Sequence, residues 1–546
     1  MANFLRLTVM TRAGTLLGVA TAVASAQPAN GRESPAYSHT PSRVVQSPAA
    51  AGGQPISSRD RVYTADMASN TVSVIDPKTG VVLGTIPLGS DNLGQILGPK
   101  DTGEVGVHGL GFSRDGRRLD AISVNSNSAQ LIDTQNNKVL TTTYVGRSPH
   151  EGFMAPDGKS LWVAVRGQRY VSVLSTGTGR ELQRIRTADG PSKVVFSPDG
   201  ALAYVNHLRA RVVEVIRVSD RRIVKRISGT APQSSDEAIS PDGRELWLGH
   251  PFTGQTTVID ARRMRVLTIL NTGPRTNHPQ FITKPDGRNY AYLTVGGLNQ
   301  TLVFLRNGER LRLVRRIQNH GFGPHGIWPS PDNTRIYVAL QNSDAVDVID
   351  TSTDTVVNTL RVGQDPMALV YVANAVPTGS GRRGLSRQGL GQRVQTMPVQ
   401  VGGNTGRAAL TVRRLQYTDQ LVFNARGLPA RATFTVKGVR PDGTVAPLFS
   451  VRTNASGNVD QAIAYTDFFG VYRQVSLVRA QRGTPRASFA TYGFLCEAVS
   501  DGTQRHHFEI NGRQRRSPSW GVRRDDRPHS GSIAIAGLEP AARDHA

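Results

Sequence analysis

Short apolar runs alternate with polar turns along residues 61–375, and the whole pattern repeats. Six of the turns carry Asp-Gly or Asp-Asn, and their successive aspartates are 42, 42, 43, 44 and 46 residues apart: Asp115, Asp157, Asp199, Asp242, Asp286 and Asp332. β-Branched and aromatic residues fill the runs, which is typical of strands in hairpins. A period of about 40–45 residues with four short strands predicts the blades of a β-propeller.

The two ends of the repeat region are incomplete in complementary ways. Residues 62–89 contain three strand-like runs without a preceding innermost strand, and Asp365–Tyr371 is a single strand-like run with no second strand after it. We therefore predict that these fragments form one blade. Pairing the N- and C-terminal half-blades would close a seven-bladed ring and leave no open edge in its first sheet.

Two segments show the repeat most clearly, Val62–Asp76 (VYTADMASNTVSVID) and Tyr337–Asp350 (YVALQNSDAVDVID). They resemble the repeat of the YVTN β-propeller family, and the resemblance covers residues 61–375. It implies a bacterial secreted or surface-layer-like repeat protein. The family also includes binding proteins and relatives of enzymes, so the resemblance predicts the fold and leaves the function open.

The rest of the chain divides by composition. A basic start, an apolar run over residues 13–24 and the small residues Ala24-Ser25-Ala26 predict a signal peptide at 1–26, so we expect a secreted or periplasmic protein, including one held at the cell surface. We further predict a disordered linker at 27–60, an Arg/Gly-rich linker at 376–402, a small β-sandwich at 403–482 and a disordered basic tail at 483–546. No later apolar run is long enough to cross a membrane. The single cysteine, Cys496, excludes an intrachain disulfide.

The formal net charge of +24 raises the question of an anionic partner. Arginines recur on the outer hairpins of three successive predicted blades: Arg221, Arg222, Arg262, Arg263, Arg315 and Arg316. A basic arc of this kind would bind an acidic polysaccharide or an anionic surface. The alternative is that these arginines only keep exposed strands soluble.

Six histidines occupy related positions in the repeat. His108, His150 and His325 precede their turn aspartate by seven residues, His278 precedes Asp286 by eight, and His207 and His250 follow their turn aspartate by eight. The start of an innermost strand and the end of the next strand lie on the same face of a propeller, so we predict that these six side chains form a ligand site at one mouth of the central channel. His108, His150 and His325 are the candidate metal ligands within the set.

A structural role for these histidines is the alternative, because two repeats carry serine at the same position, Ser192 and Ser235. The stretched connection Ser90–Val107, with three carboxylates among glycines, is a second candidate feature of this face.

Sequence motifs for catalysis are missing. There is no Gly-x-Ser-x-Gly elbow, phosphate loop, His-Glu-x-x-His or haem-attachment motif, so we assign no catalytic residue and expect no cofactor. The first hypothesis is a secreted non-enzymatic binding or surface protein whose propeller face binds a small ligand, a glycan or a protein. One alternative is a lactonase-like or metal-dependent oxidoreductase propeller with its site at the histidine-bearing mouth. The other is an envelope polyanion binder that uses the rim arginines.

Overall fold

The computed structural model of the chain describes residues 53–90, 105–307, 310–401, 406–415 and 418–480. Every regular element in these ranges is a β-strand, and all of them belong to one compact unit. The predicted signal peptide, the predicted tail and most of the Ser90–Val107 connection lie outside the described residues. The described part of the chain contains no helical segment with the length and apolarity that a membrane crossing requires.

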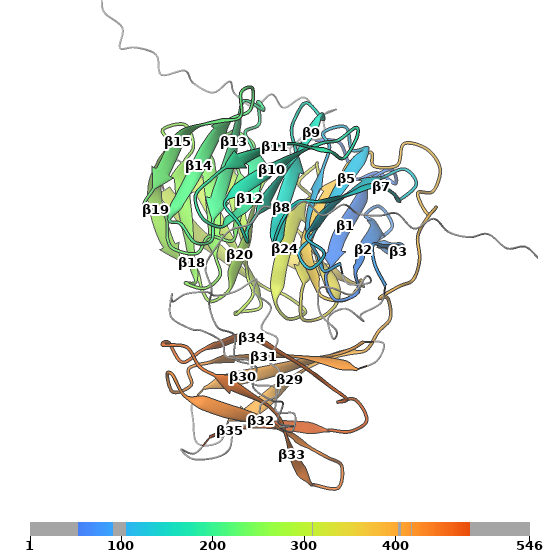
Figure 1. Cartoon of the computed structure of the whole chain (residues 1–546), viewed down its shortest axis with the longest axis vertical. Coiled ribbons are helices and arrows are strands. Elements are labelled where there is room, and N and C mark those ends of the chain that lie inside the picture. Colours follow the sequence, from blue (N-terminus) through green and yellow to red (C-terminus); the bar gives the residue numbers. More distant parts are fainter. Residues whose placement is uncertain (1–52, 91–104, 308–309, 402–405, 416–417, 481–546) are drawn as a thin grey trace, which may run out of the picture. The chain divides into compact units, whose positions relative to one another are not determined.

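Seven four-stranded antiparallel sheets follow one another as blades (Figure 1). From the innermost to the outermost strand, the first three are β28 (Pro366–Val372), β1 (Arg61–Asp66), β2 (Thr71–Asp76), β3 (Val81–Pro87); β4 (Val107–Phe112), β5 (Arg118–Ser123), β6 (Ser128–Asp133), β7 (Lys138–Tyr144); β8 (Pro149–Met154), β9 (Ser160–Val165), β10 (Tyr170–Ser175), β11 (Glu181–Arg186).

The next four blades are built in the same order: β12 (Pro191–Phe196), β13 (Leu202–His207), β14 (Val212–Arg217), β15 (Arg222–Ser228); β16 (Asp236–Ile239), β17 (Glu245–His250), β18 (Gln255–Asp260), β19 (Arg265–Asn271); β20 (Thr276–Thr283), β21 (Asn289–Val295), β22 (Gln300–Asn307), β23 (Arg310–Gln318); β24 (Pro324–Pro329), β25 (Arg335–Leu340), β26 (Ala345–Asp350), β27 (Thr355–Arg361). The predicted seven-bladed propeller is therefore confirmed.

The ring closes where the sequence predicts it. Strand β28 pairs antiparallel with β1, with Tyr371 opposite Val62 and Val370 opposite Tyr63. The Tyr371 hydroxyl donates a hydrogen bond of 2.6 Å to the Asp60 carboxylate, which fixes the junction from the N-terminal side. Each innermost strand contacts the innermost strand of the next blade, through β28 and back to β4.

Apolar side chains fill the space between blades, which is why single blades cannot fold alone. The indole of Trp162 lies edge-on to Phe196 of the next blade, with ring centroids 5.4 Å apart. Around the axis, Phe112, Phe153 and Trp328 from three innermost strands pack together, with centroid separations of 5.6 to 6.5 Å. Aromatic pairs at these distances add to the stabilisation that burial provides.

A second domain follows, consisting of β29 (Val394–Val401), β30 (Arg407–Arg414), β31 (Asp419–Arg426), β32 (Thr433–Val439), β33 (Val445–Arg452), β34 (Val459–Thr466) and β35 (Gln474–Arg479). Strand β29 pairs with β30 over most of its length and with β35 at its end, so it joins the β29–β30–β31–β34 sheet to the β33–β32–β35 sheet. Apolar residues of both sheets form one core. This confirms the predicted small β-sandwich. The buried Arg413 joins the domain to the propeller through ion pairs, with Nη2 at 2.8 Å from Asp344 Oδ1 and at 3.9 Å from Asp365 Oδ1.

The domain boundaries differ from the predicted ones. The sandwich begins with β29 at Val394, inside the segment predicted as a linker at 376–402. In the same segment Ser386 exchanges two backbone hydrogen bonds with Thr85 of β3, so it is packed against the first blade. Residues 53–60 of the predicted disordered linker are also placed, and Asp60 is buried. Composition predicts linkers in these segments, whereas their order comes from contacts with other parts of the chain, such as the pairing of Ser386 with Thr85.

Replacing Val370 with aspartate tests the closing strand. The Val370 side chain is 1% exposed, so a carboxylate there must be buried without a partner, and we expect the propeller to lose most of its stability or to fail to fold. Val357→Asp is the matched control, because Val357 is 53% exposed on an outermost strand and the change should alter the unfolding free energy by about 0.5 kcal/mol or less. Equal thermal transitions of the two variants would contradict a closed ring.

Candidate functional site

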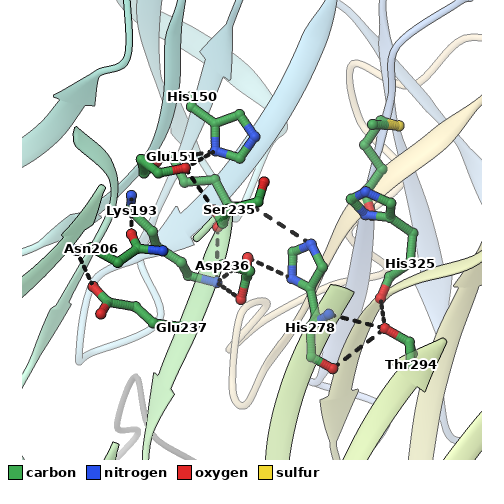
Figure 2. A network of polar contacts seen from close by, with 12 residues as sticks. His150, Glu151, Lys193, Asn206, Ser235, Asp236, Glu237, His278, Thr294 and His325 are labelled. Atoms are coloured by element: carbon green, nitrogen blue, oxygen red, sulfur yellow. Dashed lines mark hydrogen bonds and ion pairs between the residues drawn. The ribbon is translucent and has the colours of Figure 1, made fainter. Parts of the chain in front are cut away.

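Four of the six predicted histidines meet at the axis of the propeller. They come from four innermost strands, and we call them the histidine cluster: His108 (β4), His150 (β8), His278 (β20) and His325 (β24). The ring centroids of His108 and His150 are 4.1 Å apart, those of His278 and His325 are 4.7 Å apart, and those of His108 and His325 are 6.1 Å apart. Three of them are seen in Figure 2. The predicted convergence therefore holds for these four side chains; His325 is half-buried and the other three are buried.

Three charged side chains lie among these rings, and we call them the ion-pair group: Glu151, Lys193 and Asp236. The Lys193 ammonium lies 2.8 Å from Glu151 Oε2 and 3.1 Å from Asp236 Oδ2. Asp236 Oδ2 also lies 2.9 Å from His278 Nδ1, which connects the group to the histidine cluster (Figure 2). All three are almost completely buried. A small cavity beside them is lined by Lys193, Glu237, Gln280 and Trp328 among others.

Sequence reasoning missed the ion-pair group because strands normally point alternate side chains to opposite faces. In β8 the register shifts between Pro149, opposite Val165, and Gly152, opposite Val163, which is a β-bulge with one extra residue. A bulge redirects side chains, and here the consecutive residues His150 and Glu151 both enter the site. The signal was present in the sequence: Glu151, Lys193 and Asp236 each stand six residues before their turn aspartate.

Burial and charge determine the protonation of the ion-pair group. Burial raises the pKa of Glu151, and the Lys193 ammonium opposes that effect. Burial would also raise the pKa of Asp236, but His278 and Lys193 outweigh it and lower that pKa. For Lys193 burial favours the neutral amine, whereas the two carboxylates reverse this and raise its pKa. Lys193 is therefore a permanent cation held between two buried carboxyl groups.

Backbone carbonyls fix the orientation of two rings in the histidine cluster. His150 Nδ1 lies 3.1 Å from the carbonyl oxygen of Ser192, and His325 Nδ1 lies 3.2 Å from that of Met367. A carbonyl only accepts hydrogen bonds, so each Nδ1 carries the proton and each Nε2 keeps a lone pair. His108 Nδ1 is buried without a hydrogen-bond partner.

Three rings of the cluster, those of His108, His150 and His325, are electrically neutral at physiological pH. Burial is the main cause that lowers the pKa values of His108, His150 and His325, and for the first two the nearby Arg166 guanidinium adds to it. Neutral imidazole is the form that binds metal ions and accepts protons. The site can therefore hold a ligand that needs nitrogen lone pairs.

The other two predicted histidines have different surroundings. His207 is bonded within its own blade, with Nε2 3.3 Å from Glu214 Oε2 and Nδ1 3.1 Å from the carbonyl oxygen of Val212. His250 uses both nitrogens, at 2.9 Å from the Pro232 carbonyl oxygen and 2.9 Å from Thr257 Oγ1. Within the described part of the chain neither ring stacks on the histidine cluster, and we assign both a structural role.

The rim arginines lie where the sequence places them. They are in or beside the outermost strands β15, β19 and β23, where Arg222, Arg263, Arg315 and Arg316 are exposed and Arg221 and Arg262 are half-buried. Polyanion binding by this surface stays a hypothesis.

Comparisons with known proteins show distant similarity. NirF of Stutzerimonas stutzeri is 23% identical over 314 residues, which are 52% of this chain and 73% of NirF. The hydrazine synthase subunit beta of Kuenenia stuttgartiensis is 25% identical over 231 residues, 34% of this chain and 60% of that subunit, so the chain spans less than two thirds of it. No protein-family model matches, so membership of the YVTN family is not confirmed.

Two solved structures resemble the chain more weakly. The periplasmic gluconolactonase of Pseudomonas aeruginosa is 21% identical, with a TM-score of 0.47 over 57% of this chain and 99% of that one. Hydrazine synthase of Kuenenia stuttgartiensis is 19% identical, with a TM-score of 0.44 over 48% and 89%. Fold and site together define a seven-bladed β-propeller protein with a buried cluster of histidines and paired charges at its axis.

Removing the buried cation tests the ion-pair group. Lys193→Met leaves two buried carboxyl groups without their counter-charge, so we expect the unfolding free energy to fall by about 3–5 kcal/mol. Urea unfolding measures the change. Lys225→Met, on the exposed face of β15, is the control and should have little effect. Equal stability of the two variants would show that Lys193 is not the counter-charge of the two buried carboxyl groups.

His250 makes the stability of the propeller depend on pH. Burial lowers its pKa to about 4 in the folded state, against about 6.5 in the unfolded chain. The unfolded state therefore takes up a proton first, and the contribution of His250 is complete above pH 6.5 and declines by about 3 kcal/mol as the pH falls to 4.

The test compares the unfolding free energy of wild type and His250→Gln between pH 7 and 4. The wild type should lose stability more steeply than the variant over this range. The exposed His320→Gln should follow the wild type. Parallel curves for wild type and His250→Gln would contradict the assignment.

Proposed function

We propose that this chain is an exported, non-enzymatic binding protein, and that the histidine cluster with Glu151 is its site for a small ligand. One observation carries the proposal: two polar atoms in the site, His108 Nδ1 and Glu151 Oε1, are buried without hydrogen-bond partners. Leaving such an atom unpaired destabilises a fold by about 1–3 kcal/mol. A ligand that bonds to these atoms explains why the chain keeps them.

The contrast with His250 supports this interpretation. Its ring is as deeply buried as that of His108, yet both of its nitrogens have partners inside the protein. The propeller is therefore able to satisfy a buried imidazole completely where the role is structural. His108, by contrast, has a buried nitrogen without a hydrogen-bond partner, and it lies where histidines from four blades meet.

Export is the part of the proposal that rests on the N-terminal sequence. The basic start, the apolar run and the small residues up to Ala26 have the organisation of a signal peptide. A chain with one cysteine can fold in an oxidising compartment without forming wrong intrachain disulfides.

An enzyme is the second candidate, and the Asp236–His278 pair is the observation that favours it. A carboxylate bonded to Nδ1 of an imidazole orients Nε2 as a general base. The similarity to a gluconolactonase concerns the fold and assigns no substrate to this chain. Hydrolysis of glucono-δ-lactone by the purified chain, abolished in His278→Gln, would replace the binding role with this one.

The stability of a leucine variant tests the proposed site without knowledge of the ligand. His108→Leu replaces an unpartnered buried polar group with an apolar side chain, so in the presence of EDTA we expect an unfolding free energy equal to or above that of the wild type. His250→Leu is the matched control: it removes two hydrogen bonds and should destabilise the propeller by about 2 kcal/mol or more. A loss in His108→Leu as large as in His250→Leu would show that the cluster is structural.

A further inference from the structure

We propose that the histidine cluster holds one divalent transition-metal ion, with His108, His150 and Glu151 as its protein ligands. The inference rests on the proposed function, because it names the ligand class of the same site. Each of the three residues offers one ligand atom, and these atoms lie within 4.8 Å of one another. All three side chains are at most 3% exposed.

The distances between the three ligand atoms are slightly longer than those in an occupied zinc site. Bonds of about 2.0–2.2 Å from zinc to nitrogen and oxygen place tetrahedral ligand atoms roughly 3.5 Å apart. Small rotations of the imidazole rings and the carboxyl group close the remaining difference. The site therefore needs no rearrangement of the strands that carry it.

Each proposed ligand has one polar atom that makes no hydrogen bond and can bind the ion. His150 is fixed through Nδ1 by the Ser192 carbonyl, which leaves Nε2 for the ion. Glu151 is fixed through Oε2 by Lys193, which leaves Oε1 without a hydrogen bond, at 3.9 Å from His278 Nε2. His108 contributes its unpartnered Nδ1. Ligands oriented through their second polar atom are the usual support of protein metal sites.

A competing set of residues shares Glu151 but is already bonded. Glu151, Asp236 and His278 also present ligand atoms within 4.8 Å of one another. In that set Asp236 and His278 bond to each other at 2.9 Å, and both oxygens of Asp236 accept from Lys193. An ion there would have to displace these contacts, so we assign it to the first set.

The donor atoms select the class of metal. Two imidazole nitrogens and one carboxylate oxygen favour zinc, copper or a similar ion over magnesium or calcium, which take mainly oxygen ligands. Three protein ligands leave a coordination position open, as in metal sites that bind a further molecule. Arg166 lies beside the site and donates to the hydroxyl groups of Ser192 and Ser235.

The experiment uses the full chain without a histidine tag. After treatment with EDTA, the protein is dialysed against ZnCl₂ and its zinc content is measured by mass spectrometry, and a parallel sample with CuCl₂ is examined by electron paramagnetic resonance. The chain has 12 histidines, so binding elsewhere is subtracted by comparison with variants. The variants are His108→Leu and Glu151→Gln, and the control is the exposed His320→Ala.

We expect wild type and His320→Ala to bind one zinc ion more than His108→Leu, and Glu151→Gln to lose or weaken the same ion. The copper spectrum of the wild type should show coupling to two imidazole nitrogens, and this signal should be absent from His108→Leu. Equal zinc content and equal copper spectra of wild type and His108→Leu would overturn the metal assignment.

The stability test separates that failure from failure of the proposed function. If His108→Leu binds as much zinc as wild type but is no less stable than wild type, the site takes a ligand other than a metal. If His108→Leu binds as much zinc as wild type and is as unstable as His250→Leu, the ligand site itself is refuted.

Discussion

The pairing of β1 with β28 is the constraint on which the rest of the structure depends. A propeller sheet buries both faces only against its neighbours, so an unclosed ring would expose two blade faces and a strand edge to water. Closure also builds the site. Strand β28 stands between β24 and β4 in the ring, and its Met367 carbonyl accepts the hydrogen bond from His325 Nδ1. The chain end that completes the fold thus orients one of the clustered imidazoles.

The axis of this propeller combines apolar packing, provided by Phe112, Phe153 and Trp328, with buried charged side chains. The ion-pair group places one ammonium and two carboxyl groups close to these aromatic rings, and the Lys193 nitrogen lies 5.6 Å from the centre of the Phe153 ring. Buried ion pairs contribute little net stability compared with well-packed apolar residues. Their presence beside neutral imidazoles is better explained by the chemistry of a site than by the stability of the fold.

Much of the fold could be predicted because it follows from local periodicity. The repeated Asp-Gly turns and the two half-units at 62–89 and 365–371 predict seven blades and their closure, and the structure confirms both. The sandwich was also predicted, but its first strand, Val394–Val401, lies in a segment where flanking glycines and arginines hide the strand pattern. The segment forms a strand because it pairs with the next strand, β30, and at its end with β35, which comes much later in the sequence.

The site could be predicted only in part. Repeat offsets place His108, His150, His278 and His325 correctly at the axis, and they also select His207 and His250, which make their contacts within their own blades. Glu151 and Lys193 could not be predicted from strand alternation, because bulges in β8 and β12 interrupt it at these residues. The most direct measurement of the central claim is a crystal structure of the zinc-loaded chain with anomalous diffraction data at the zinc edge. We predict an anomalous peak bonded to His108, His150 and Glu151 inside a closed seven-bladed ring. A closed ring with no peak at these side chains would refute the metal site.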